Sequence, residues 1–230
     1  EKACSKWASI IISLPSEQSQ PINITSEIKE LIVETALAGA GISSVNYSNG
    51  KPYSKSGEIE INKDHIHSLS YSYSASGDSI LYWVFLHELG HILGVGPHWL
   101  NHGLVAFYYQ LTENDDHGDR TSRLYVGEKG VYEYTKILNA KYGTNYQYLG
   151  IPIEDNFGAG SNSVHLDEGE HPVGDSNPTS VKRYFQVKDL ITNEIIPDSI
   201  TNPVEYYGLD EELMTAKIED GNSSSQGDMP

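Results

Sequence analysis

The sequence is poor in cysteine and in positive charge. Among 230 residues it has one cysteine, Cys4, which excludes an internal disulfide framework and a metal site built from cysteines. Its 15 Lys and Arg stand against 32 Asp and Glu, a formal net charge of −17, and they nowhere form a cluster. A protein that neutralises nucleic-acid phosphates needs a basic face, and so does one attracted to anionic lipid. We therefore expect neither nucleic acid nor an anionic membrane surface as a partner.

Long hydrophobic runs are absent as well. The longest apolar run, 80–86, is interrupted by Tyr82 and followed by His87, so we expect no membrane span. The sequence shows no secretory signal and begins at Glu1 rather than at Met, which predicts a processed or excised segment of a longer chain. Its length is typical of one large domain. We place a single domain at 1–219, with lobes over 1–96 and 97–219, and a flexible tail at 220–230.

Hydrophobic periodicity predicts an α/β N-terminal part followed by an irregular C-terminal part. The expected strands are 7–14, 57–62 and, within a region of weak periodicity, 181–191. The expected helices are 25–38, 80–93 and 131–141. The helix 80–93 is apolar nearly all round and is closed by Gly94, so we expect it to be buried.

The chemical signal lies in this buried helix, which contains His87-Glu88-Leu89-Gly90-His91. Two His at positions i and i+4 lie on one helix face, so both imidazoles can reach one metal ion. Imidazole ligands with an open position for water are typical of catalytic zinc. Glu88 can then accept a proton from the metal-bound water as the general base. The alternative is a pair of core histidines that hydrogen-bond to the backbone.

A catalytic zinc needs a third protein ligand. In the commonest zinc peptidases with this motif, the third His lies six residues after the second. Position 97 is Pro97, whereas His98 and His102 come one and five residues late. The compact pattern therefore fails, and the candidates for the third ligand are the other His, Asp and Glu residues.

The stretch from His87 to Gly96, followed by Trp99, is similar to the leishmanolysin-type metzincins and their bacterial relatives. Further similar pieces follow in the family's order: Tyr125-x-Gly127, the Gly-rich approach 151–160 that leads to a His, and Glu212-Leu213-Met214-Thr215. The resemblance implies an α+β, metzincin-like zincin fold, with a mixed twisted sheet and the active-site helix in the N-terminal part and an irregular C-terminal part. It further implies a zinc-dependent endopeptidase activity on protein or peptide substrates and an extracellular or cell-surface location. It also implies a C-terminal part held by packing or ions, because the family's disulfides have no counterpart.

By the same resemblance, His87, His91 and His165 are the zinc ligands, Glu88 is the catalytic base, and Met214 is the Met-turn residue below the metal. His171 is the rival third ligand. An extended substrate is expected to add to an edge strand, for which we take 57–62. Cys4 is either a zinc ligand in a latent form or an ordinary thiol.

Calcium is a second candidate cofactor. Oxygen-rich loops can bind calcium. The residues near His165 in the sequence include several acidic and amide side chains, namely Asp155, Asn156, Asp167, Glu168, Glu170 and Asp175. The alternative is that they form a solvated acidic loop.

Two non-enzymatic or restricted alternatives to the endopeptidase remain. One is a non-catalytic module of a larger surface or particle protein, in which zinc only stabilises the fold. The other is a protease segment that processes only its parent chain.

Overall fold

The computed structural model describes residues 1–11, 21–33, 36–74, 76–110, 120–154, 163–167, 183–184, 186–196, 205–206 and 213–214. These residues form a mixed α+β structure with small open sheets. The chain divides into two compact units, one over Glu1–His102 and one over Gly103–Ala216. The expected tail at 220–230 lies outside the described residues.

The first unit is built on a three-stranded sheet in the order β1-β3-β2. Strand β3 (Lys51–Asn62) pairs in parallel with β1 (Asn23–Lys29) and antiparallel with β2 (Ala38–Ser48). Ile59 and Ile61 of β3 are each 1% exposed. This is the alternation that the sequence predicts for 57–62, with the isoleucines turned to the inner face.

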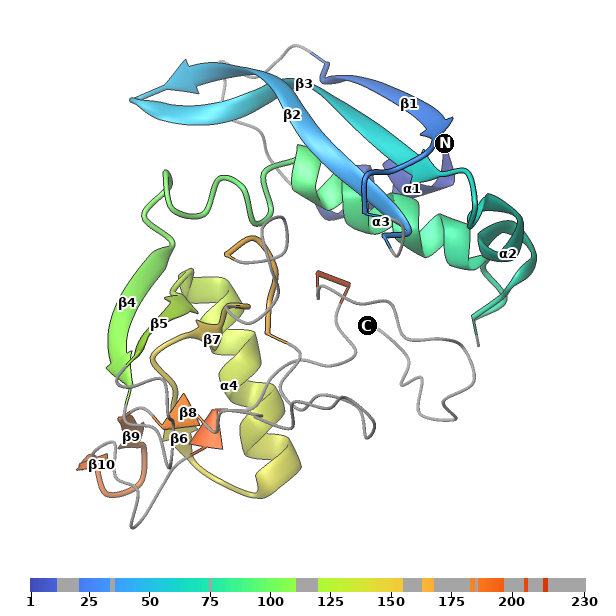
Figure 1. Ribbon diagram of the computed structural model, residues 1–230. Helices are drawn as coiled ribbons and strands as arrows, with labels where there is room; N and C mark the ends of the chain where they lie inside the picture. Colours follow the sequence, from blue (N-terminus) through green and yellow to red (C-terminus); the bar gives the residue numbers. More distant parts are fainter. Residues whose placement is uncertain are drawn as a thin grey trace. The chain divides into compact units, whose positions relative to one another are not determined.

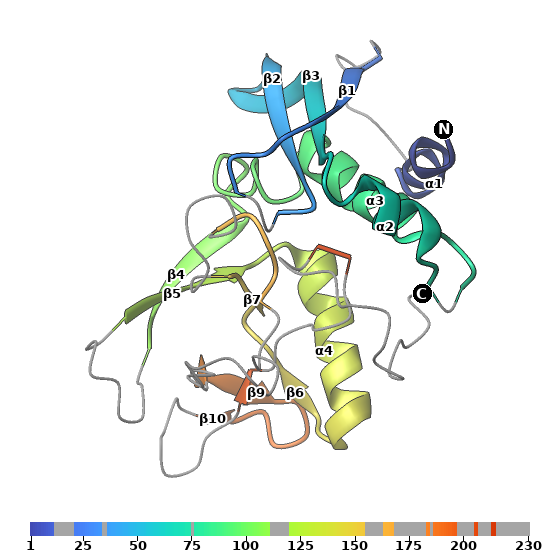
Figure 2. The ribbon, with the colours of Figure 1, turned by 45° about the vertical axis from the view of Figure 1, so that its right-hand side comes forward.

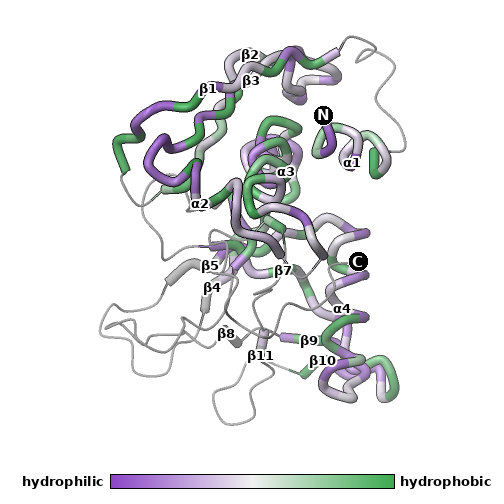
Figure 3. The backbone as a smooth tube through the Cα atoms, turned by 90° about the vertical axis from the view of Figure 1, so that its right-hand side faces the viewer, coloured by the Kyte–Doolittle hydropathy of each residue, from purple (hydrophilic) through white to green (hydrophobic). Residues whose placement is uncertain are grey.

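Helix α3 (Ile80–Ile92) lies along one face of this sheet and packs against β2 and β3 (Figure 1). Two further helices, α1 (Lys2–Ile10) and α2 (Ile66–Tyr71), also contact α3 (Figure 2). Hydrophobic residues run along α3, with hydrophilic ones between them (Figure 3). The predicted buried helix 80–93 is therefore confirmed.

The second unit combines helix α4 (Glu128–Tyr142) with short strands. One sheet has the order β4-β5-β7, and the other has the order β10-β9-β6, while β8 pairs with β11. The strands are β4 (Val105–Gln110), β5 (Arg120–Tyr125), β6 (Tyr146–Gln147), β7 (Ile151–Pro152), β8 (Arg183–Tyr184), β9 (Val187–Asp189), β10 (Ile195–Ile196) and β11 (Glu205–Tyr206).

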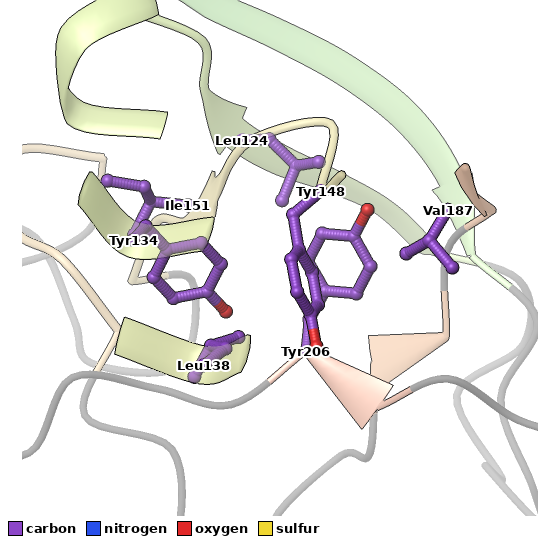
Figure 4. Close-up of a cluster of buried hydrophobic side chains, with 7 residues drawn as sticks. All are labelled: Leu124, Tyr134, Leu138, Tyr148, Ile151, Val187 and Tyr206. Atoms are coloured by element: carbon purple, nitrogen blue, oxygen red, sulfur yellow. The ribbon is translucent and has the colours of Figure 1, made fainter. Parts of the chain in front are cut away.

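The core of the second unit is rich in tyrosine (Figure 4). Tyr148 meets Tyr134 and Tyr206 edge to face, at ring-centroid distances of 5.5 and 4.9 Å. The Tyr206 hydroxyl donates to the Gln186 carbonyl and accepts from the Leu149 amide, so its polar end is satisfied inside the core. The predicted helix 131–141 is confirmed within α4, and Gly143 ends it in the left-handed conformation at φ 66°.

Two predictions near the N-terminus are wrong. The segment predicted as strand 7–14 begins inside helix α1, where the Trp7 indole donates to the Leu86 carbonyl at 2.8 Å and the packing on α3 decides the structure. The segment predicted as helix 25–38 contains strand β1 instead. Parallel pairing with β3 along Asn23–Lys29 decides the structure there.

A third correction concerns the expected substrate strand. The segment 57–62 belongs to β3, which is the central strand of its sheet and has no free edge. Among the described residues, the edge strands of this sheet are β1 and β2. In the part of the chain that the structure describes, no helix has both the length and the hydropathy to cross a membrane.

Candidate metal centre

Helix α3 begins and ends at the residues that the sequence indicates. The Ser79 side chain caps the helix by accepting from the Tyr82 amide at 3.3 Å. At the other end, Gly94 takes a φ of 99°, a left-handed conformation that favours glycine. The turn is closed by the Val95 amide, which donates to the Gly90 carbonyl at 2.9 Å. The helix is thus fixed at both ends by local interactions.

His87 and His91 lie one turn apart on α3, and each is 7% exposed. Their Nε2 atoms are 3.0 Å apart, and their rings are nearly perpendicular. The Nδ1 atom of His91 lies 3.0 Å from the Val95 carbonyl oxygen, to which a protonated Nδ1 donates. This contact fixes the ring and directs Nε2 toward His87.

His165 is held by strand pairing rather than by a helix. Leu166 forms an antiparallel bridge with Ile153. On one side of the bridge the Glu154 amide donates to the His165 carbonyl at 3.0 Å, and on the other the Asp167 amide donates to Pro152 at 3.0 Å. His165 is 7% exposed.

Met214 supports the same segment. Its carbonyl accepts a hydrogen bond from the Leu166 amide at 2.9 Å, and its side chain is 6% exposed. The chain therefore brings Met214 beside the residue that follows His165, although 48 positions separate Leu166 from Met214 in the sequence. Glu212 and Thr215, which flank the expected turn, lie outside the described residues.

The three histidines predicted as ligands form one cluster. One ring nitrogen from each of His87, His91 and His165 lies within 4.8 Å of the other two, and all three side chains are buried. They are close enough to bind one metal ion. The donor set fits zinc, since two nitrogens at 2.0–2.1 Å from one tetrahedral ion stand about 3.3 Å apart, near the 3.0 Å between His87 and His91.

Glu88 lies between these ligands in sequence and is also buried, at 7% exposed. Within the described residues, no hydrogen bond or ion pair reaches its carboxylate. Burial raises the pKa of Glu88 from 4.5 to about 7. A buried carboxyl without a partner is costly, and this one lies in the same helical segment as His87 and His91.

Other residues named from the sequence lie elsewhere. His98 Nε2 is 3.2 Å from the Ser54 hydroxyl, and His102 Nε2 is 2.8 Å from the Pro52 carbonyl, so both tie the turn after α3 to β3. Cys4 is exposed on α1 and does not belong to the histidine cluster. The rival ligand His171 lies outside the described residues.

The calcium prediction stays untested, because five of its six residues lie outside the described part of the chain. The sixth, Asp167, is buried at 7% exposed.

Sequence reasoning did not name Glu154 as a site residue. It is 1% exposed, and its amide donates to the His165 carbonyl while its own carbonyl accepts from the Ser163 amide. The apolar segment 149–153 that precedes it is a signal of burial in the sequence. A carboxylate at the end of such a segment needs a polar partner.

Comparison with models of known protein families, with curated proteins and with solved structures finds no significant match to this chain. The chemistry of the site is therefore the basis for assigning a function.

Proposed function

We propose that this chain is a zinc-dependent endopeptidase of the metzincin type. The observation that carries the proposal is the clustering of three buried histidines, together with Glu88 on the helix that supplies two of them, a buried carboxylate without a partner among the described residues. The resemblance of the segment 87–96 to leishmanolysin-type enzymes supports the same assignment.

His87, His91 and His165 hold the ion through neutral imidazole nitrogens. When bound, zinc supplies a water acidified to a pKa of about 7 and a positive charge beside the scissile carbonyl. Glu88 accepts the proton released as water attacks the carbonyl and delivers it to the leaving amine. The burial of Glu88 favours this exchange because it moves the pKa of the carboxyl toward neutrality.

The number of ligands distinguishes an enzyme from a structural zinc module. Structural zinc is almost always closed by four protein side chains, whereas catalytic zinc keeps one position for water. Within the described residues, the cluster contains three histidines and no fourth donor. This supports the catalytic alternative.

The peptide substrate is proposed to bind in an extended form at a sheet edge. Strand β3 is excluded because both its edges are paired. Strand β2 is an edge among the described strands, and it packs against α3, which carries two ligands and the proposed base. Main-chain hydrogen bonds to β2 would hold the substrate without demanding a particular sequence.

The test is hydrolysis of a mixed peptide library by the wild type and by Glu88→Gln, with zinc content measured in both. We expect Glu88→Gln to keep zinc and to lose about 10²–10⁴-fold in rate, which is the usual contribution of a general base. A chelator should abolish hydrolysis by the wild type. The matched control is Glu58→Gln, at an exposed carboxylate on β3, which should keep full activity.

The outcomes separate the alternatives. Full activity in Glu88→Gln would contradict the role of Glu88. A zinc-loaded wild type that cleaves no peptide would favour the structural module, and cleavage restricted to the parent chain would favour self-processing.

A further inference from the structure

The turn that follows α3 supplies an outer partner to one of the three clustered histidines. The Val95 carbonyl oxygen lies 3.0 Å from Nδ1 of His91 and accepts from it when that nitrogen is protonated. Metal-bound imidazoles almost always donate their second N–H in this way, and loss of the acceptor typically costs about 10–100-fold in metal affinity. Because Val95 lies beyond the end of α3, the helix itself does not fix the direction of this carbonyl.

Two glycines flank Val95 in this turn. Gly94 and Gly96 have φ angles of 99° and 89°, both in the left-handed region that favours glycine. The peptide that carries the Val95 carbonyl ends at Gly96, so the φ of Gly96 helps to set its plane. A turn with two glycines can rearrange at little energetic cost. Contacts from outside the turn therefore decide how firmly the carbonyl is held.

His98 provides such a contact at both of its ends. Its amide donates to the Gly94 carbonyl at 3.1 Å, and its ring lies so close that a Cβ added to Gly94 would be 2.5 Å from the ring carbon Cδ2. At the other end, its Nε2 shares a hydrogen bond with the Ser54 hydroxyl at 3.2 Å. Ser54 belongs to β3 and is 7% exposed. His98 thus connects the residue before Val95 to a strand of the sheet.

Strand β3 is a firm point of attachment for the turn. It is the central strand of its sheet, and α3 packs against it. The helix and the strand come so close that a Cβ added to Gly57 would lie 2.9 Å from two carbon atoms of Ile92. A second connection follows four residues after His98, where His102 Nε2 lies 2.8 Å from the Pro52 carbonyl. The strand therefore holds the helix and the turn together.

We propose that Ser54 and His98 are positioning residues of the metal centre. Their hydrogen bond holds the turn so that the Val95 carbonyl stays on the Nδ1–H of His91. With its proton fixed on Nδ1, the imidazole presents the lone pair of Nε2 to the metal. The inference rests on the metal centre of the proposed function and not on peptide hydrolysis.

Ser56 offers a matched control on the same strand. Its hydroxyl lies 2.6 Å from the Ser44 hydroxyl, so the two form a hydrogen bond between β3 and β2 and not to the turn. Ser56→Ala removes one hydroxyl from β3, as Ser54→Ala does. If any weakening of the sheet lowered metal affinity, the two variants would behave alike.

The experiment measures the zinc affinity of the full chain by competition with a chromogenic chelator. We expect Ser54→Ala to lose about 2–10-fold, because one neutral hydrogen bond changes an equilibrium constant by about tenfold at most. His98→Ala should lose at least as much, since it also removes the ring from Gly94. The double variant should lose no more than His98→Ala alone, because both changes break the same hydrogen bond. Ser56→Ala should stay within about twofold of the wild type.

A second readout is the Nδ1–H proton of His91 in an NMR spectrum of the zinc-loaded protein, assigned by its absence in His91→Ala. In Ser54→Ala this signal should move upfield and exchange faster with water, because the hydrogen bond to the Val95 carbonyl lengthens. In Ser56→Ala it should not move. A purely structural role of Ser54 would change stability and leave the signal in place. Far-UV circular dichroism checks the fold, and Ser54→Ala carries the test if His98→Ala does not fold.

The outcomes separate this inference from the proposed function. Wild-type zinc affinity in Ser54→Ala with an unmoved signal would overturn the inference and leave the metal centre intact, and so would an equal loss in Ser56→Ala. The expected losses in a wild type that binds zinc but cleaves no peptide would support the inference and contradict the endopeptidase. Absence of zinc binding by the wild type would overturn both.

Discussion

Helix α3 and the segment 163–167 contribute histidines to the same cluster by different means. On α3, the spacing of His87 and His91 follows from helical geometry, and Ser79 and Gly94 fix the ends of the helix. In 163–167, the position of His165 depends on pairing with 152–154 and on Met214. The helix positions its histidines through contacts between residues close in sequence, whereas the extended segment requires contacts between residues far apart in sequence. The two parts should therefore respond differently to substitution.

Removal of ligands should give the largest effect. His91→Ala and His165→Ala should each lower zinc affinity by more than the roughly 10–100-fold that outer partners contribute. His165→Ala should keep the higher residual affinity, because the helix still holds two nitrogens 3.0 Å apart. Competition titration measures this, with His67→Ala, at an exposed histidine of α2, as the control. A higher residual zinc affinity in His91→Ala than in His165→Ala would contradict this expectation.

The turn after α3 should be the next most sensitive position. An added Cβ at Gly94 would lie 2.5 Å from the His98 Cδ2 atom, at a φ of 99°. Gly94→Ala should lower the free energy of unfolding by about 2–4 kcal/mol, because the left-handed strain and the clash act together. Gly77→Ala tests the strain alone, since Gly77 has a φ of 82° and no atom within 4 Å of the added Cβ.

Urea denaturation of metal-free Gly94→Ala and Gly77→Ala, each against the wild type, measures both losses in the free energy of unfolding. We expect about 1 kcal/mol for Gly77→Ala. Equal losses at the two glycines would show that the contact with His98 does not matter.

Packing of α3 on the sheet should have a somewhat smaller effect. A Cβ at Gly57 would lie 2.9 Å from two carbon atoms of the Ile92 side chain and 2.8 Å from the Gly41 carbonyl oxygen. Gly57→Ala should therefore cost about 1–3 kcal/mol of stability. Gly39→Ala, where nothing lies within 4 Å, should stay within about 0.5 kcal/mol of the wild type. A neutral Gly57→Ala would mean that α3 is not held closely against β3.

The smallest effect should come from pH. Burial, and then the charge of neighbouring His102, lower the pKa of His98 below 6.5. The unfolded chain therefore binds this proton more readily, so stability is complete above pH 6.5 and is lost as the pH falls through the folded pKa. His98→Gln should flatten the decline in unfolding free energy between pH 7 and 5. An unchanged slope would exclude His98 as a contributor.

The contrast between local and distant contacts also explains which features the sequence predicts. Helix α3 is predictable because its hydrophobic residues, its Ser79 cap and its Gly94 stop lie within one short segment. Strand β1 is predicted wrongly as part of a helix because the pattern of 25–38 is read locally, whereas pairing with β3, more than 20 residues further on, decides its structure. Helix α1 is missed because the contact of Trp7 with α3 is not encoded nearby.

The same limit applies to the site. His87, Glu88 and His91 are identified by spacing alone, whereas His165 comes from resemblance to a family, and no periodicity points to it. Glu154 is missed because its main-chain contact with His165 forms only when the segments 152–154 and 165–167 come together. Distant pairing of this kind leaves little trace in a single sequence.

The most direct test of the central claim is X-ray absorption at the zinc edge of the zinc-loaded wild type, which counts and identifies the ligands. We predict one zinc per chain with three imidazole nitrogens at about 2.0–2.1 Å and one further oxygen from water. Two imidazoles would remove His165 from the site. A fourth protein ligand, or any sulfur, would contradict an open catalytic centre.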